Sequence, residues 1–161
     1  MQTNRCLNCM AEMGDATVCP HCGYDPSQSQ EVPYSLRPGS ILHGKYLVGR
    51  MLGQGGFGIT YVGFDLALEL KVAIKEYFPL NQLSRDQSKS NEVHWNTTHE
   101  QSGQWQSGCE SFLKEARKMA KISTVPGVVR VRETFNENNT AYIVMDFAEG
   151  VTLRKWLERR G

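Results

Sequence analysis

The sequence has almost no net charge and no long apolar run. Its 18 lysines and arginines nearly balance 17 aspartates and glutamates, which leaves a formal net charge of +1. Because such a balance provides no long-range field to attract nucleic acid or an anionic membrane, neither partner is expected. Nowhere do about 18 apolar residues follow one another, and the opening MQTNRCLNCM lacks the apolar core of an export signal. We therefore expect a cytoplasmic protein with no membrane span within this segment.

Cysteine is scarce beyond the first 22 residues. Of five cysteines only Cys109 lies further along, and we expect it to be a small buried hydrophobic residue. The other four form two CxxC pairs, Cys6 with Cys9 and Cys19 with Cys22. Each pair directs two thiolates to one ion from a tight turn, and two pairs supply the tetrahedral set that Zn²⁺ prefers. Since disulfides normally accompany secretion, the spacing favours a metal site.

Residues 1–24 resemble the zinc ribbons found at the ends of many bacterial proteins. Met10 departs from that pattern, because a glycine commonly follows the first CxxC pair. The departure removes no ligand, but it affects the backbone of the first turn. Four thiolates leave no open coordination position, so a structural Zn²⁺ is expected rather than a catalytic one. Docking to another protein surface stays open as a second role.

The rest of the chain divides by composition into a linker and a larger domain. Residues 25–39 combine proline with serine and glutamine, the composition of a linker. From residue 40 to 161 we expect one domain, interrupted by a polar insert at about 81–107 that is either functional or mobile. Within the insert, Val93 and Trp95 are spaced for a short strand.

Hydrophobic patterns predict five strands and one long helix in this domain. Short β-prone runs predict strands over 45–52, 58–65 and 70–78, and two more over 128–135 and 140–147 around the turn sequence ENN. Apolar residues at 112, 116, 119 and 122 predict a helix over 109–122. A further short helix is expected near the end of the sequence, with an apolar stripe that needs a partner.

The segment LGQGGFGITYVGFD, residues 52–65, contains the pattern GxGxxG at Gly53, Gly55 and Gly58. The pattern alone is weak, because dinucleotide-binding folds share it. Those folds require a helix directly after the glycines, whereas the run ITYV favours a strand. The glycines are therefore expected in a hairpin whose backbone N–H groups close over a triphosphate, with Phe57 at the tip as a movable lid.

Followed by VAIK, which ends at Lys75, and by a helix that carries Glu115, this hairpin resembles the ATP-binding lobe of protein kinases. The segments GGFGITY, IKEYFP and NNTAYIVMDFAEGVTL are similar to those of bacterial members of the eukaryotic-type serine/threonine kinases. The resemblance implies an α+β fold, an antiparallel five-stranded sheet with one long helix. It also implies that Lys75 binds the α- and β-phosphates of ATP and pairs with Glu115. The helical pattern places Glu115 on the inward face, where a lone carboxylate is costly.

The resemblance further implies which residues contact the nucleotide. Met145 would be the gatekeeper, the backbone of residues 146–148 would bind the adenine base, and Thr60 replaces the usual valine. The implied cofactor-binding set is Leu52, Gly53, Gln54, Gly55, Gly56, Phe57, Gly58, Thr60, Ala73, Lys75, Met145, Asp146 and Ala148.

The 161 residues contain neither the His-Arg-Asp nor the Asp-Phe-Gly motif that the resemblance places in a C-terminal lobe. Phosphoryl transfer also needs Mg²⁺ ligands and a positioned acceptor. We therefore expect a serine/threonine kinase whose C-lobe is absent here, so that these residues alone are inactive and bind ATP weakly. The alternative is a non-catalytic zinc-bearing adaptor that keeps the lobe for protein interaction. Intact glycines, Lys75 and Glu115 favour the kinase.

Overall fold

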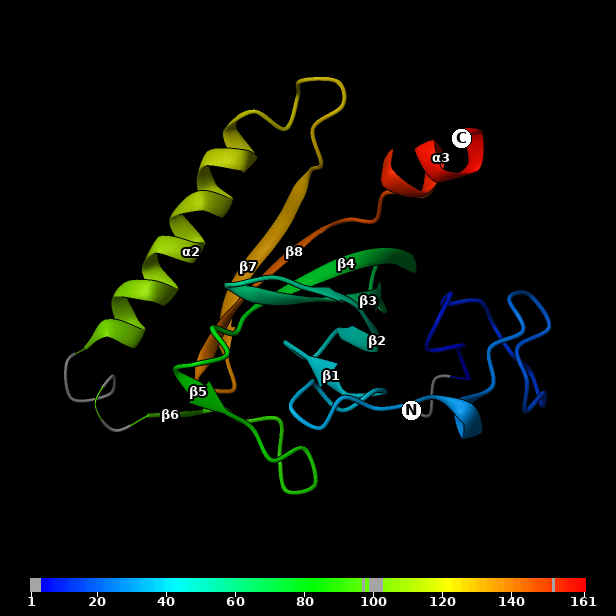
Figure 1. Ribbon diagram of the computed structural model, residues 1–161, viewed down its shortest axis with the longest axis horizontal. Coiled ribbons are helices and arrows are strands. Elements are labelled where there is room, and N and C mark those ends of the chain that lie inside the picture. The colour runs from blue at the N-terminus through cyan, green and yellow to red at the C-terminus, as the bar shows by residue number, and fades with distance from the viewer. Residues whose placement is uncertain (1–3, 97, 99–102, 152) are drawn as a thin grey trace.

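The computed structural model describes residues 4–96, 98, 103–151 and 153–161. A curled antiparallel sheet, with strand order β1-β2-β3-β4-β8-β7, lies between a long helix and the four-cysteine module, residues 4–24 (Figure 1). The strands are β1 (Ile41–Leu42), β2 (Tyr46–Gln54), β3 (Gly58–Asp65), β4 (Leu70–Tyr77), β7 (Val131–Glu137) and β8 (Thr140–Asp146). The five predicted strands are confirmed, and the sheet gains a sixth, β1, because His43 and Gly44 adopt positive φ and fold it back on β2.

The predicted turn sequence ENN joins β7 to β8. Glu137 pairs with Thr140, which leaves Asn138 and Asn139 as the two turn residues. Their φ values of 52° and 64° are those of a two-residue turn that matches the twist of the strands. Asparagine tolerates this left-handed conformation better than most residues, so the turn fixes the register of the two strands.

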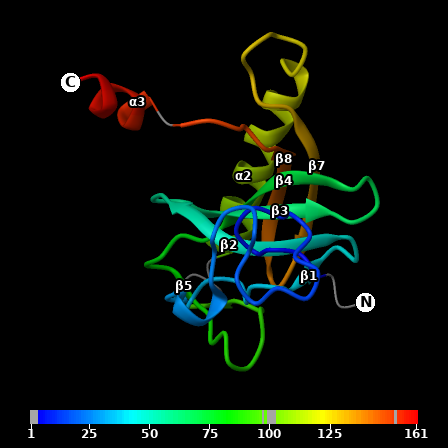
Figure 2. The same ribbon diagram turned by 90° about the vertical axis from the view of Figure 1, so that its right-hand side faces the viewer.

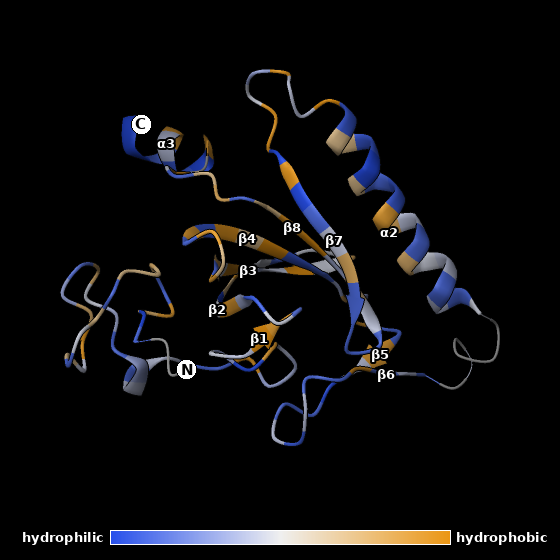
Figure 3. Cartoon of the chain, turned by 180° about the vertical axis from the view of Figure 1, so that it is seen from behind, coloured by the Kyte–Doolittle hydropathy of each residue, from blue (hydrophilic) through white to orange (hydrophobic). Residues whose placement is uncertain are grey.

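The long helix is α2 (Gln104–Lys121), and it packs on β7 and β8 through one apolar stripe. Figure 3 shows apolar residues along β4 and β8, and a mixture of polar and apolar residues on α2. The helix begins five residues before the predicted start at 109. Trp105 extends the stripe by a turn, and its ring lies 6.0 Å from the ring of Trp95 in the insert. The last helix, α3 (Leu153–Arg160), leaves Leu153 and Leu157 exposed.

The polar insert is packed against the sheet over its described part. Its strands β5 (Leu83–Ser84) and β6 (His94–Trp95) pair with each other, which confirms the short strand predicted near Val93 and Trp95. Leu83, Val93 and Trp95 belong to the main hydrophobic core. Residues 97 and 99–102 of the predicted insert lie outside the described residues. The structure therefore favours a structural role for residues 81–96 over mobility.

A buried ion pair joins the insert to the sheet. Arg85 donates from Nη1 and Nη2 to the two carboxylate oxygens of Glu76 at 3.0 and 2.5 Å, and both side chains are fully buried. The hydroxyl groups of Tyr61 and Tyr142 donate to the same carboxylate at 3.1 and 2.6 Å. Because side chains alternate along a strand, Glu76 projects to the face opposite Lys75. The insert thus contacts both faces of the sheet, because Arg85 meets Glu76 on one face and Trp95 packs against Tyr77 on the face that α2 covers.

The curl of the sheet brings the turn between β1 and β2 against β7, where Glu133 binds three partners. Its carboxylate accepts a short hydrogen bond from Tyr46 and lies 2.9 Å from Lys45 Nζ and 3.1 Å from His43 Nε2. Burial raises the pKa of Glu133, but the hydrogen bonds from Tyr46 and Lys45 outweigh burial and lower it below its usual value. This contact closes the sheet at an end far from the glycine hairpin.

Replacing Glu133 with glutamine is expected to destabilise the fold by about 1 kcal/mol at neutral pH, the loss of charge-assisted hydrogen bonds at a partly exposed site. Since the folded-state pKa is depressed, the contribution is complete above the unfolded-state pKa of about 4.3 and fades as the pH falls through the folded value. Urea unfolding of wild type and Glu133→Gln from neutral pH to about pH 3 measures this. The exposed Glu92→Gln is the control, and a difference that does not shrink in acid contradicts the assignment.

No helix of the described residues combines the length and the apolarity needed to cross a membrane.

Candidate functional sites

The glycine hairpin connects β2 to β3, as predicted, and its tip is open to solvent. Gly55 N–H donates to Gly58 O at 2.9 Å and closes the turn. Atoms added as Cβ at Gly53, Gly55 and Gly56 would meet no atom within 4 Å, whereas at Gly58 a Cβ would lie 2.5 Å from Glu76 O. Gly58 is therefore required by the close approach of β4, and the other three leave the hairpin free to adjust to a ligand. Phe57 stands at the tip with 74% of its surface exposed.

Lys75 lies in the middle of β4 and faces a cavity of about 570 Å³ between the sheet and α2. It pairs across the sheet with Thr60 on β3 and Ile143 on β8, which line the same cavity. The other lining residues are Phe57, Tyr77, Gly108, Ser111, Phe112, Glu115, Ala116, Met119 and Met145. Strand, hairpin and helix therefore converge on one space large enough for a nucleotide-sized ligand.

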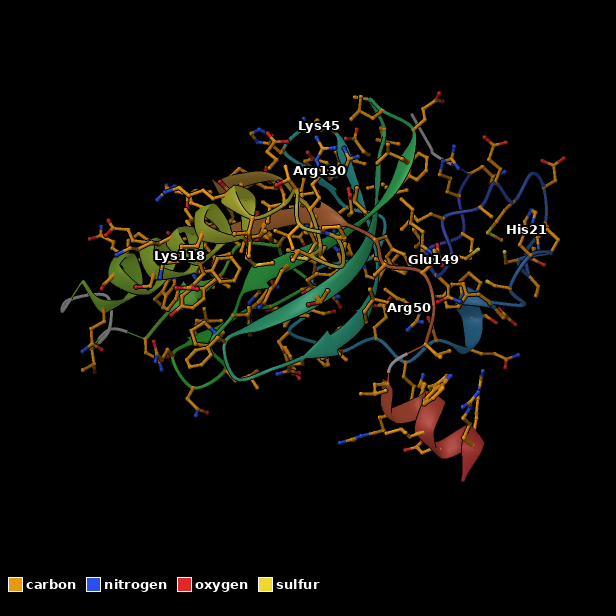
Figure 4. The ribbon with its side chains drawn as sticks, turned by 90° about the horizontal axis from the view of Figure 1, so that it is seen from above. His21, Lys45, Arg50, Lys118, Arg130 and Glu149 are labelled. Carbon is orange, nitrogen blue, oxygen red and sulfur yellow. The ribbon has the colours of Figure 1, made fainter. Side chains whose placement is uncertain are left out.

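Glu115 differs from the sequence-based expectation of an inward, paired carboxylate. Its side chain is 69% exposed and lies 3.1 Å from Lys118 Nζ one turn further along α2, and Figure 4 labels Lys118 on this helix. Among the described residues no ion pair joins it to Lys75, whose ammonium instead lies 5.9 Å from the ring centroid of Phe112. The apolar side chains of Phe112 and Ala116 take the inward positions, so Glu115 is left at the rim of the cavity.

The residues predicted to surround an adenine base come from several strands, with Leu52 on β2, Thr60 on β3, Ala73 on β4 and the remainder at the end of β8. Met145 pairs with Ala73 across the sheet and lines the cavity. The N–H of Asp146 donates to Arg130 O at 2.9 Å, and its carboxylate accepts from Arg132 Nε at 2.6 Å. Asp146 is thus engaged in fixing the end of the strand. Leu52 is 39% exposed on β2.

The four predicted metal ligands form one cluster. All four sulfur atoms lie within 4.8 Å of one another, with 3.6 Å between Cys6 and Cys22 and 3.7 Å between Cys9 and Cys19. Four thiolates around Zn²⁺ at about 2.3 Å stand about 3.8 Å apart, so the cluster fits a tetrahedral zinc site. A disulfide, at about 2.05 Å, does not fit these separations. His21 is exposed and lies on the far side of the module from the sheet (Figure 4).

A second set of contacts orients this cluster. The backbone N–H and the side-chain amide of Asn8 approach the sulfurs of Cys6 and Cys22, both at 3.4 Å. Burial raises the pKa of the Cys6 thiol to about 12. A buried neutral thiol must lose its proton to bind a metal, so loading of the cluster releases protons.

Comparisons with known proteins place this fold. No protein-family model matches the chain. The chain is 34% identical over 119 residues to serine/threonine-protein kinase pkn2 of Myxococcus xanthus, a match that covers 73% of this chain and 12% of that protein. It superposes on a solved structure titled "PpkA-294 apo form" with a TM-score of 0.69 and 31% identity, over 79% of this chain and 43% of that one. The chain carries the N-lobe of a serine/threonine protein kinase.

A second relative supports the same N-lobe. Serine/threonine-protein kinase PrkC of Bacillus subtilis is 27% identical over 123 residues, which covers 76% of this chain and 16% of that protein. The chain therefore spans less than a fifth of the length of both curated relatives. The predicted fold class is confirmed, with α2 and the curled sheet in the arrangement of a kinase N-lobe.

Sequence reasoning missed the residues that tie the flanking segments to the N-lobe. Arg85 and Glu76 were not predicted to meet, although a glutamate between Lys75 and Tyr77 in a buried strand is a signal for a buried partner. Tyr34 of the linker was also missed, and its hydroxyl donates to Gln54 Oε1 in the glycine hairpin at 2.7 Å. The two contacts join residues 9 and 20 positions apart that belong to different segments, so the periodicity of a single strand or helix does not identify the partners.

Proposed function

We propose that this N-lobe binds ATP and, when completed by a C-lobe, serves phosphoryl transfer from ATP to protein hydroxyl groups. The observation that carries the proposal is the convergence of Phe57 of the glycine hairpin, Lys75 and Glu115 on one cavity of about 570 Å³. The names of the relatives support the same activity. A glycine hairpin followed by a strand lysine suits a triphosphate, because backbone N–H groups and one ammonium meet its negative charge.

Each residue of the site has a role in this proposal. N–H groups at the tip of the hairpin, other than that of Gly55, which closes the turn, bind the phosphates, and Lys75 holds the α- and β-phosphates. Ala73 and Met145 border the base, while Leu52 covers it from β2. Glu115 reaches Lys75 after a rotation of α2 that breaks its exposed pair with Lys118, a contact worth only about 0.5 kcal/mol. Mg²⁺, held by ligands of the C-lobe, would neutralise the charge of the triphosphate.

We also propose that Cys6, Cys9, Cys19 and Cys22 bind one structural Zn²⁺. The tetrahedral separations of the sulfur atoms support this assignment, and four thiolates leave no position for a substrate.

Covalent capture tests the nucleotide site even where affinity is weak. An acyl-phosphate derivative of ATP transfers its acyl group to an amine held beside the phosphates, so it should label Lys75 in preference to the other lysines. Lys75→Arg should abolish that labelling, and excess ATP should suppress it about tenfold at ten times its dissociation constant. Mass spectrometry of the digested chain locates the acyl group. Lys114→Arg on the exposed side of α2 is the matched control and should leave the labelling of Lys75 unchanged.

A non-catalytic adaptor is the second candidate, and the pairing of Glu115 with Lys118 is the observation in its favour. The same labelling experiment separates the two. If Lys75 reacts no faster than Lys114, and ATP gives no protection, the nucleotide site is refuted and the adaptor is favoured.

A further inference from the structure

The four-cysteine module docks on the strand that leads into the glycine hairpin. Figure 2 looks onto the module and shows it in front of β2 and β3. At Gly49 and Arg50 the register between β2 and β3 shifts, so this part of β2 is bulged away from its partner. There the N–H of Arg50 donates to Leu7 O at 2.8 Å, a carbonyl of the module. The module thus supplies a backbone hydrogen bond where β2 departs from regular pairing.

Side-chain contacts connect this docking point to the cysteine cluster. Arg50 Nε donates a short hydrogen bond to Asn8 Oδ1, and the amide nitrogen of Asn8 lies 3.4 Å from Cys22 Sγ. In Figure 4, Arg50 lies on the side of the sheet that faces the module. A ligand sulfur, Asn8 and β2 are therefore linked by consecutive contacts.

Met10 is the apolar anchor of the docked module. It is 2% exposed and packs with Leu47, Val62 and Phe64 in a small core separate from the main one. Its φ of 64° is a strained conformation that glycine would adopt without cost. Gly49 fits beneath it, since a Cβ there would lie 2.5 Å from Met10 Cε and 2.4 Å from Leu7 O. The packing of the Met10 side chain in this small core therefore explains why a methionine is found at a strained backbone position.

The linker holds the hairpin at a second point. The hydroxyl of Tyr34 donates to Gln54 Oε1 at 2.7 Å, and Gln54 lies between the first two glycines of the hairpin. The ring of Tyr34 stacks on Phe78 at 5.8 Å, and its carbonyl accepts from buried Arg85 at 3.0 Å. The stack on Phe78 and the hydrogen bond from Arg85 therefore position Tyr34, and with it the hydroxyl group that binds Gln54.

The docked module also reaches the other end of the nucleotide site. Phe147 packs against the small core around Met10, and it lies between the two residues predicted to meet the adenine base. The N-terminal segment therefore contacts the start of the glycine hairpin and the end of β8, where the adenine is predicted to bind. At the hairpin itself, Cβ atoms added at Gly53, Gly55 and Gly56 would meet no atom within 4 Å.

We propose that the four-cysteine module and its linker brace the glycine hairpin, with Met10 and Tyr34 as positioning residues that raise the affinity of the site for nucleotide. The proposal rests on the ATP site proposed above. A free hairpin must be ordered when it closes on phosphates, and that ordering weakens binding. Fixing β2 at Arg50 and Gln54 restricts the hairpin before the nucleotide arrives, so less freedom is lost on binding.

Two variants test the brace while all four cysteines remain. Met10→Gly removes the anchor and suits the backbone, and Tyr34→Phe keeps the stack on Phe78 but loses the hydrogen bond to Gln54. In Met10→Gly the ATP concentration that half-protects Lys75 from acyl-phosphate labelling should rise about fivefold or more, the lower end of coupling between sites. Tyr34→Phe should give a smaller shift in the same direction. The labelling rate at saturating probe should stay the same, whereas a merely structural defect would lower the amount of protein that reacts.

Hydrogen exchange without nucleotide provides a second readout. Amides of residues 50–60 should exchange faster in both variants and in protein stripped of zinc by a chelator. Val18→Ala, at a 45% exposed position of the module, is the matched control and should match wild type in both measurements.

Unchanged exchange in both variants overturns the brace, whatever the nucleotide data show. Faster exchange with unchanged protection by ATP overturns its effect on affinity. Failure of wild type to label at Lys75 refutes the proposed function instead, and the exchange data still decide the brace.

Discussion

Replacing Arg85 with methionine is expected to destabilise the lobe by about 3–5 kcal/mol, the usual cost of leaving one partner of a buried ion pair alone. Both side chains of the Arg85–Glu76 pair have no exposed surface. Without the guanidinium, Glu76 keeps two hydroxyl donors but no counter-charge in the core. Few single substitutions outside the apolar core should have a comparable effect.

The hydrogen bonds from Tyr61 and Tyr142 to Glu76 remain when Arg85 is replaced, so the loss of stability comes from the unpaired charge. Burial and then the negative charge of Glu76 raise the pKa of Tyr61 and of Tyr142 well above the usual range. Both phenols therefore remain protonated donors across the neutral and moderately alkaline range. They satisfy the carboxylate oxygens as hydrogen-bond acceptors, but they cannot neutralise them.

Urea unfolding, followed by the fluorescence of the tryptophans on the insert and α2, measures the loss. Arg37→Met is the matched control, because the Arg37 side chain donates to Gln87 O at an exposed site and should cost less than about 1 kcal/mol. The double variant Arg85→Met with Glu76→Gln should recover part of the stability, because the neutral amide removes the unpaired buried charge and its oxygen still accepts hydrogen bonds from the tyrosine hydroxyl groups. A single variant within about 0.5 kcal/mol of wild type would contradict a buried pair.

The sequence predicted the elements of the N-lobe because those elements follow local patterns. Alternating apolar residues identified the strands, and the asparagine pair identified the turn between β7 and β8. The long helix was predicted with its C-terminal bound almost correct, but its start was not, because Trp105 gains its partner Trp95 only in the folded chain. Local rules locate elements, whereas contacts between distant segments set where some of them begin.

Of the thirteen residues predicted to contact the nucleotide, four line the cavity, namely Phe57, Thr60, Lys75 and Met145. Thr60, Lys75 and Met145 do line one cavity, since strand register follows from the hydrophobic pattern. The rotation of α2 about its own axis is set by how Phe112 and Ala116 pack, and it leaves Glu115 at the rim. A helical pattern defines a face about a third of the circumference wide, which cannot separate an inward carboxylate from one at the edge.

Met10 stands where zinc ribbons commonly have glycine, and its packing on the sheet gives a physical reason for the difference. In isolation, a methionine at a left-handed position of a zinc ribbon costs about 1–2 kcal/mol of strain. Burial of a methionine side chain contributes about 1.5–3 kcal/mol, enough to offset that strain once the module is docked. Packing on the sheet beneath the module, rather than metal binding, therefore explains why this residue is a methionine.

Removing the metal is expected to unfold the four-cysteine module while the sheet and α2 remain folded. Residues 4–24 have only Cys6, Met10 and Cys19 buried, so their apolar core is too small to order them. Structural zinc supplies about 10–16 kcal/mol of apparent binding free energy in peptides, and that term disappears with the ion. Cys19→Ser should lower bound zinc from about one ion per chain to nearly none, because a closed four-thiolate site tolerates the loss of a ligand poorly.

Metal analysis together with limited proteolysis measures this outcome. Cleavage within residues 4–24 should become rapid after chelation and in Cys19→Ser, while the strands of the main sheet and α2 stay protected, because the main core does not include any residue of the module. Cys109→Ser, on α2, is the matched control and should keep both its zinc and its resistance to cleavage. If Cys19→Ser retains one zinc per chain, the tetrahedral assignment is wrong. If the chelated module stays as resistant as the loaded one, docking through Met10 and Arg50 is sufficient to hold it, and the metal is not what folds it.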